Sequence, residues 1–241
     1  MKTKLPILLL TLVLALTMAV PLAFGAPSVM VDGKKVNFDV ELGVENGRTL
    51  VPVRAIFEAL NAKVKWVGGE TKPAVLANKG ATEIKLEVGS ITAYRNGVPI
   101  KLDVPARVVN NRTMVPIRFI GESFGDKVDW DNKTETIVIT SAITIADVDL
   151  IKETVAIRNN SVKNFDLTGW YLRSKTAKEP YQFPDGYTLK AGSTAFIHSG
   201  PMATESLPAH LFWTKDYMWN NDEDQANLYD STANIVYSWP R

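Results

Sequence analysis

The sequence has no cysteine and only two histidines, and these gaps set the first limits on its chemistry. Without cysteine there is no disulfide bond and no thiolate ligand for a metal ion. A lipid-anchored precursor is excluded as well, because it needs a cysteine at its cleavage site. Stability must therefore come from ordinary hydrophobic cores, and the 241 residues suffice for two domains of about 100 residues each.

A large charge of one sign is also missing. Residues 26–142 hold 16 basic and 14 acidic side chains, a net charge of +2. Residues 143–241 hold 9 basic and 12 acidic side chains, a net charge of −3. Proteins that bind a phosphate backbone usually carry a clear basic excess, so nucleic acid is an unfavoured partner.

Only one long apolar run occurs, from Leu5 to Phe24. Lys2 and Lys4 precede it, and small residues at the signal-peptidase positions end it at Gly25. This order predicts a secretory signal peptide, with an uncleaved membrane anchor as the alternative. No other segment is long and apolar enough to span a bilayer after cleavage, so we expect a secreted, extracellular protein that can associate with the cell wall.

What the sequence does contain is an internal repeat with an offset of 64 residues. Asn46–Glu58 lies over Asn110–Glu122, and Lys63–Trp66 lies over Lys127–Trp130. Across positions 46 to 66, 11 of 21 residues are identical at this offset. Chance does not produce such a match, and the first half of the chain is therefore a duplication.

Each copy predicts the same short series of elements: a hairpin, a strand, a helix and a further strand. Asx-Gly pairs favour two-residue hairpin turns, and proline is accepted in the first turn of a helix. The expected elements are hairpin turns at Asp32-Gly33 and Asn96-Gly97, strands at Thr49–Val51 and Thr113–Val115, helices after Pro52 and Pro116, left-handed caps at Asn61 and Gly125, and strands at Lys63–Trp66 and Lys127–Trp130.

Two repeated pairs of side chains are candidate binding residues in this half. Arg54 and Arg118 could bind an anionic ligand, although each could instead anchor its helix through the glutamate one turn further on. Trp66 and Trp130 could stack on a sugar ring. Because each tryptophan follows a charged residue in its strand, we expect both to face the core.

The doubled Arg-Thr-x-Val-Pro-x-Arg motif, followed each time by Lys-Val-x-Trp, resembles the copper amine oxidase N-terminal-like domain, also called a stalk domain. The resemblance covers about residues 29–141. It implies a non-catalytic module of the kind that accompanies exported wall hydrolases, surface-layer proteins and other envelope proteins of Gram-positive bacteria. It implies neither copper nor oxidase activity, and residues 26–142 contain no histidine or cysteine to hold copper.

From Ile143 onward, short apolar runs alternate with turn residues, a pattern typical of an all-β sandwich. No helix is expected in this half. The expected strands lie near 143–145, 154–158, 167–172, 188–189, 195–198, 226–229 and 234–237.

This half resembles the lamin tail domain, an immunoglobulin-like β-sandwich. The segments that carry the resemblance are Val155–Asn159, Asp166–Leu172, Tyr181–Gly186, Leu189–Gly192 and Trp219–Asp230. Bacterial members of that family occur in secreted or membrane-attached proteins, often beside hydrolase or nuclease domains. The resemblance therefore implies a binding or tethering module.

An unusual number of aromatic side chains lies between Leu207 and Trp219. An exposed patch formed by these side chains would suit a glycan or a partner protein. The alternative is that they pack into the core beneath a long loop. The candidate contact residues are Phe212, Trp213, Tyr217 and Trp219.

Ionisable candidates in the second half are few. Asp222 and Asp224 could contribute to a calcium site, but they lack the order of an EF-hand loop and fit a solvated turn better. His198 stands beside Ser199, yet no Gly-x-Ser-x-Gly segment exists, so a structural or exposed histidine is favoured. A zinc site from His198 and His210 has no supporting ligand spacing.

These observations predict a mainly β protein with three segments. They are a signal peptide at 1–25, a duplicated α+β domain at 26–142 with repeats at about 29–92 and 93–141, and an immunoglobulin-like sandwich at 143–241.

The function expected from the sequence is that of a secreted bacterial cell-surface binding or adaptor protein without catalytic residues, metal or cofactor. Its partner would be a cell-wall polymer or another envelope protein. Two alternatives remain: an extracellular hydrolase or hydrolase accessory subunit, and a nucleic-acid-binding surface module.

Overall fold

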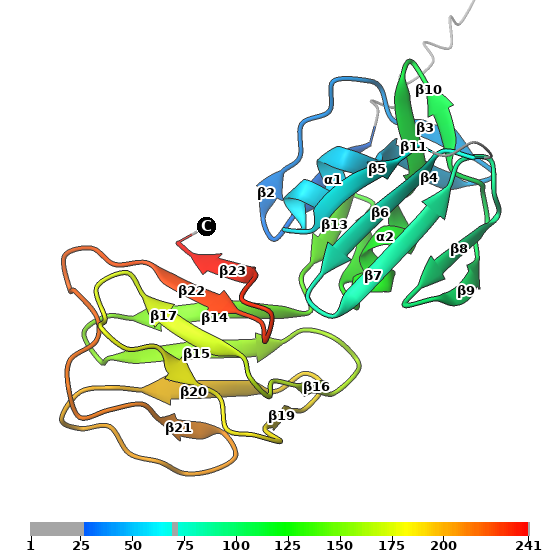
Figure 1. The fold of residues 1–241 in the computed structure, drawn as a ribbon. Coiled ribbons are helices and arrows are strands. Elements are labelled where there is room, and N and C mark those ends of the chain that lie inside the picture. The colour runs from blue at the N-terminus through cyan, green and yellow to red at the C-terminus, as the bar shows by residue number, and fades with distance from the viewer. Residues whose placement is uncertain (1–26, 69–71, 241) are drawn as a thin grey trace, which may run out of the picture.

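The computed structural model describes residues 27–68 and 72–240. The predicted signal peptide therefore lies outside the described residues. The chain forms two lobes, one coloured blue to green and the other yellow-green to red (Figure 1). One hydrophobic core ends at Ile139 and the other begins at Ile143. The first lobe is a mixture of sheets and two short helices, while the second contains strands alone over residues 143–240.

The centre of the first lobe is a four-stranded sheet to which each repeat gives one hairpin. Its order is β10 (Arg107–Val109), β11 (Arg112–Pro116), β4 (Arg48–Pro52) and β3 (Gly43–Glu45). The two repeats meet where β4 pairs antiparallel with β11, with Val51 opposite Val115. These two valines are equivalent positions of the repeat, so a pseudo-twofold axis passes between them.

Each repeat continues with a helix and two strands. In the first copy these are helix α1 (Val53–Ala59) and strands β5 (Lys63–Val67) and β6 (Ala74–Lys79). In the second copy they are helix α2 (Ile117–Phe124) and strands β12 (Lys127–Asp131) and β13 (Thr136–Thr140). Val53, Ile56 and Phe57 of α1 are buried. Asn61 and Gly125, just beyond the helices, have φ angles of 58° and 84°. The predicted helices and their left-handed caps are thus confirmed.

The repeats also exchange their N-terminal hairpins. The hairpin of β1 (Ser28–Val31) and β2 (Lys34–Lys35) extends the sheet of the second repeat through parallel pairing of β1 with β13. The equivalent hairpin, β8 (Thr92–Arg95) and β9 (Val98–Lys101), extends the sheet of the first repeat through β7 (Thr82–Glu87). Each sheet is therefore extended by the start of the other repeat.

The second lobe is a sandwich of two four-stranded sheets, as the sequence pattern predicts. One sheet has the order β14 (Ile143–Asp149), β15 (Thr154–Asn159), β20 (Thr194–His198), β21 (His210–Phe212), and the other has the order β18 (Tyr181–Gln182), β17 (Tyr171–Ser174), β22 (Ala226–Tyr229), β23 (Ile235–Trp239). A short ladder of β16 (Phe165–Asp166) and β19 (Thr188–Leu189) lies at one end.

The strand expected at 167–172 is wrong in its first part. Leu167 is fully buried, but the chain turns at once, because Thr168 donates its backbone N–H to Asp166 and Gly169 has a φ of 74°. Strand β17 begins only at Tyr171. The turn moves the chain from the β16–β19 ladder into the second sheet, a change that a hydrophobic pattern does not reveal.

The two lobes are joined without a linker, since β13 ends at Thr140 and β14 begins at Ile143. Asp126 is buried at this junction, where it accepts a hydrogen bond from the backbone N–H of Ala142 at 2.9 Å and one from Lys79 at 3.1 Å. Asn61 adds a bond from its side-chain amide to the carbonyl of Val236 at 3.2 Å.

Gly121 lets strand β12 pack closely against α2. A Cβ at this position would lie 2.4 Å from Cγ2 of Val128. Gly121→Ala should therefore lower the free energy of unfolding by about 1–3 kcal/mol through overpacking, although helix propensity alone would favour alanine by ~1 kcal/mol. In a Val128→Ala background the same change should become neutral or stabilising. Urea unfolding of the single and double variants measures this, and simple additivity would contradict the contact.

Candidate binding grooves

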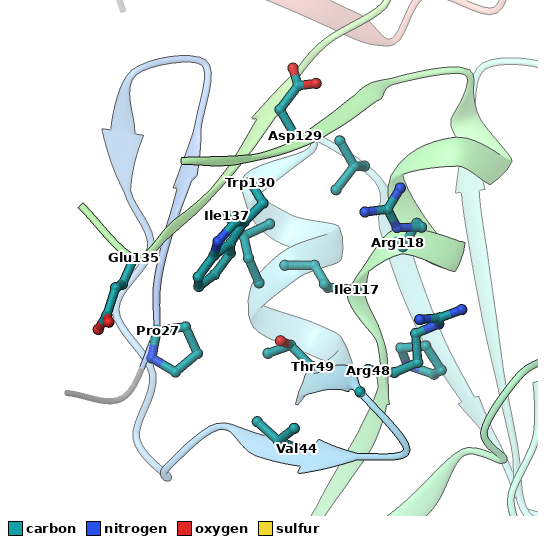
Figure 2. A pocket seen from close by; sticks show the side chains of 13 residues that line it. Pro27, Val44, Arg48, Thr49, Ile117, Arg118, Asp129, Trp130, Glu135 and Ile137 are labelled. Carbon is teal, nitrogen blue, oxygen red and sulfur yellow. The ribbon is translucent and has the colours of Figure 1, made fainter. Parts of the chain in front are cut away.

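Two surface hollows of the first lobe hold the strongest candidate site. Groove 1, of about 420 Å³, has an apolar floor and one tryptophan, and it is flanked by two arginines (Figure 2). The residues that define groove 1 are Val44, Arg48, Thr49, Pro116, Ile117, Arg118, Trp130 and Ile137. In Figure 2, Arg48 and Arg118 lie together on one side of Trp130, and Glu135 lies on the opposite side.

Groove 2 has a volume of about 610 Å³ and repeats the same set of side chains. Its defining residues are Val108, Arg112, Thr113, Pro52, Val53, Arg54, Trp66 and Pro73. Seven of the eight occupy the position 64 residues away from their counterparts in groove 1. Pro73 instead takes the place of Glu135, because Trp66 pairs with Val75 where Trp130 pairs with Ile137. The two grooves are therefore pseudo-symmetric copies of one site.

Both grooves are built from both repeats. In groove 1 the Arg48-Thr49 pair comes from the first repeat, while Arg118 and Trp130 come from the second. The antiparallel pairing of β4 with β11 causes this, because it places the start of each strand beside the start of the other repeat's helix. The first and last arginines of a single motif thus belong to different grooves.

The expectation that the two tryptophans face the core is wrong. Trp66 is 39% exposed and Trp130 is 44% exposed. Val64 shares a strand face with Trp66 and packs against the core, whereas Trp66 lies two residues further along. In the second copy, the indole N–H of Trp130 donates to Asn132 at 2.8 Å, which sets the position of the ring.

Cross-repeat ion pairs hold one arginine at each groove. Nε of Arg48 lies 2.6 Å from a carboxylate oxygen of Asp103, and Arg112 pairs in the same way with Asp39. The hydrogen bond from Arg112 holds the pKa of Asp39 below its ordinary value. These two arginines therefore have carboxylate partners within the lobe, and they brace the hairpins that form the groove walls.

The other two arginines are less engaged. Arg118 approaches Glu122 only to 3.8 Å, the one-turn pairing that the sequence suggests. Among the described residues, no ion pair joins Arg54 to Glu58 or to another carboxylate. Both side chains are exposed at the groove edge, where a guanidinium can meet a planar anion in bidentate geometry.

The aromatic segment of the second lobe divides into buried and exposed members. Trp219 is buried and stands edge-on to Trp213, with ring centroids 5.8 Å apart. Phe212 and Tyr217 are exposed. Trp213, Tyr217 and Trp219 all line one hollow of about 780 Å³. The alternative that these residues pack into the core therefore holds for Trp219, and a contact site here remains a prediction.

Glu153 positions this aromatic segment, a role that the sequence did not indicate. Its buried carboxylate accepts hydrogen bonds from the hydroxyl of Ser199 at 2.6 Å and from the backbone N–H of Met218 at 2.7 Å. The glutamate thereby ties the residue after β20 and the segment after β21 to the turn before β15. The sequence does not reveal this role, because Glu153, Ser199 and Met218 come together only in the folded chain.

The two aspartates suggested for calcium have different surroundings. Asp224 is buried and already accepts bonds from Ser174, Thr176 and the backbone N–H of Asn220. Burial alone would raise the pKa of Asp224, but these hydrogen bonds hold it below the ordinary value. Asp222 is exposed. In the described residues, no three His, Cys, Asp or Glu side chains gather as a metal site, and the calcium site remains a prediction.

The two histidines lie side by side, on the paired strands β20 and β21. Nε2 of His198 is 2.9 Å from Nδ1 of His210, and Nδ1 of His198 is 3.1 Å from the hydroxyl of Thr154. That hydroxyl also bonds to the carbonyl of Lys152. Because the Thr154 hydroxyl donates to Lys152, it accepts a hydrogen bond from the Nδ1–H of His198. Desolvation, followed by the nearby His210, lowers the pKa of His198.

The fold and these sites define a two-lobed, mainly β protein whose candidate sites are open hollows on the surface. Residues 30–139 match the family described as the copper amine oxidase N-terminal domain. Residues 131–240 match the family described as the Lamin Tail Domain. The chain carries these two domains in the order that its motifs indicate, and the first is the non-catalytic N-terminal domain of its family. No helix of the described residues has the length and apolarity to cross a membrane.

Asp224→Asn should destabilise the second lobe at neutral pH by about 1–3 kcal/mol, because an amide cannot accept all of these hydrogen bonds. Since the folded-state pKa of Asp224 is lowered, its stabilising effect is complete above the ordinary value of 3.8 and disappears as the pH falls through the lowered pKa. The difference from the parent chain should therefore shrink in acid. Denaturant unfolding across this range measures it, and Asp222→Asn is the matched control.

The histidine pair predicts a measurable titration. By NMR, the imidazole of His198 should titrate below the ordinary pKa of 6.5. His210→Ala should move that pKa upward, since it removes both a neighbouring charge and some of the shielding. The stability contributed by neutral His198 is complete above 6.5 and is lost as the pH falls through the lowered pKa. A pKa at or above 6.5 in the parent chain would contradict the pairing.

Proposed function

We propose that this protein is a secreted binding or adaptor protein of the cell surface that performs no catalysis. It contacts a polymer of the cell envelope or a partner protein, and the grooves of the first lobe are its principal contact sites. The family matches support this proposal, because a non-catalytic amine oxidase domain and a lamin tail domain together cover residues 30–240.

The observation that carries the proposal is the occurrence of the same exposed groove in both repeats. Each groove presents a partly exposed tryptophan and two arginines, the side chains that are most enriched where proteins bind partners. The tryptophans are not needed to fill the core, which is formed by other side chains. Two matching sites on one small domain suit a partner that is itself repetitive, as an envelope polymer is.

The junction between the lobes supports an adaptor role. Hydrogen bonds from Asn61 and to Asp126, together with a direct strand connection, join the lobes at a fixed geometry. A ligand held in the grooves and a partner held by the second lobe would then keep a defined relative position.

The test is sedimentation of the full-length chain with purified cell-wall preparations over a range of salt concentrations. We expect a saturable fraction of the protein to pellet with the wall and none to pellet without it. Fractionation of producing cells into medium, wall and membrane should place the protein outside the cytoplasm. A chain that stays soluble with every wall preparation, or that remains inside the cell, would contradict the proposal.

A further inference from the structure

We infer that grooves 1 and 2 are two equivalent binding sites for an anionic glycan, a chain of sugar rings that carry carboxylate or phosphate groups. This inference rests on the proposed function and names the chemistry of its ligand. It follows from the exposed tryptophan, from the distribution of charge around each groove and from the duplication.

The tryptophans supply a flat apolar surface in each groove. Trp66 and Trp130 each expose more than a third of their surface, and the aligned Val44 and Val108 are 67% and 54% exposed. Exposed apolar side chains at matching positions of both repeats add little to the hydrophobic core. An indole face beside a valine suits the C–H face of a sugar ring, which is apolar while its edge carries the polar groups.

The charge distribution favours an acidic sugar. The carboxylates of Asp39 and Asp103 are paired with Arg112 and Arg48, and Asp129 is paired with Lys127 at 2.8 Å. The cations that remain at the groove edges are Arg118, held only loosely by Glu122, and Arg54. Two carboxylates also line the grooves, Glu135 in groove 1 and Glu58 in groove 2. A carboxylate or phosphate on the sugar edge would meet these guanidinium groups while the ring covers the tryptophan.

The arrangement in groove 1 shows how one ligand would reach both features. Arg48 and Arg118 lie together on one side of Trp130, and Glu135 lies on the other (Figure 2). The polarity therefore runs across the groove, from cationic to anionic. A sugar whose acidic group points toward the arginines is accepted, and the opposite orientation is disfavoured.

Nucleic acid fits this site less well than a glycan. The region from 26 to 142 has a net charge of only +2, whereas phosphate-backbone binding depends on many basic contacts. A glycan with one charge per sugar needs only one guanidinium contact per ring. A polymer long enough to occupy both grooves at once would gain affinity without any further contact.

The test is calorimetric titration of the full-length chain with oligomers too short to bridge the grooves. An oligogalacturonate carries carboxylates, a sugar-phosphate oligomer carries phosphates, and a neutral oligosaccharide of the same length carries neither. We expect at least one anionic oligomer to bind with two molecules per chain. The neutral oligomer should bind about tenfold more weakly or worse, as expected when a charge-assisted hydrogen bond is lost. The responding oligomer identifies which acid the sites prefer.

Variants assign this binding to the grooves. Arg118→Ala with Trp130→Ala should abolish oligomer binding in groove 1. Arg54→Ala with Trp66→Ala should abolish oligomer binding in groove 2. Each pair of changes should halve the number of bound oligomers and leave the affinity of the remaining site unchanged. Together they should abolish binding without changing the cooperativity of unfolding, since the four side chains are exposed. Arg173→Ala, an exposed arginine of the second lobe, is the matched control.

The outcomes separate this inference from the proposed function. Failure of both anionic oligomers to bind, binding that survives the combined variant, or equal affinity for the neutral oligomer would overturn the glycan inference. If the combined variant still pellets with cell wall, the role as a wall-binding protein stands, but the grooves are not its principal contact sites and another surface, such as the aromatic hollow near Tyr217, carries the binding. A parent chain that never pellets refutes the proposed function itself.

Discussion

The antiparallel pairing of β4 with β11 is the contact on which the first lobe depends. With Val51 opposite Val115, the two repeats are held about a pseudo-twofold axis, and every other cross-repeat feature follows from that register. The pairing brings the first arginine of one motif beside the second arginine of the other. A slip of one residue in this pairing would turn the buried valines outward and disrupt both grooves. The fold and the candidate sites therefore depend on the same strand register.

The repeat made much of this lobe predictable from the sequence. Hairpin turns, helices and left-handed caps all carry local signals, and the structure has them at the expected positions. The exposure of Trp66 and Trp130 had no such signal. Alternation along a strand predicts which residues share a face, but it does not predict which part of that face other side chains cover. Groove formation was equally hidden, since it depends on how the two copies meet. Only the recurrence of both arginines and the tryptophan in each copy pointed toward it.

The second lobe shows the same division between local and long-range determinants. Its longer strands follow from apolar runs, whereas β16, β18 and β21 are two or three residues long and exist through their partners. Buried carboxylates then fix the connections between strands. Glu153 accepts hydrogen bonds from the distant backbone N–H groups of Met218 and Trp219, and Asp224 accepts one from that of Lys175. Their role therefore depends on tertiary contacts that no spacing rule describes.

The position of the second lobe completes the argument for open grooves. It contacts the two positions that follow the helices: Asn61 bonds to Val236, and a Cβ on Gly125 would lie 3.4 Å from the ring of Phe165. These positions are equivalent in the repeat, so the second lobe sits across the pseudo-twofold axis at the C-terminal ends of α1 and α2. The grooves lie at the opposite ends, where Arg54 and Arg118 begin the helices. A domain placed on the axis blocks neither groove, and the symmetry of the two sites therefore persists in the whole chain.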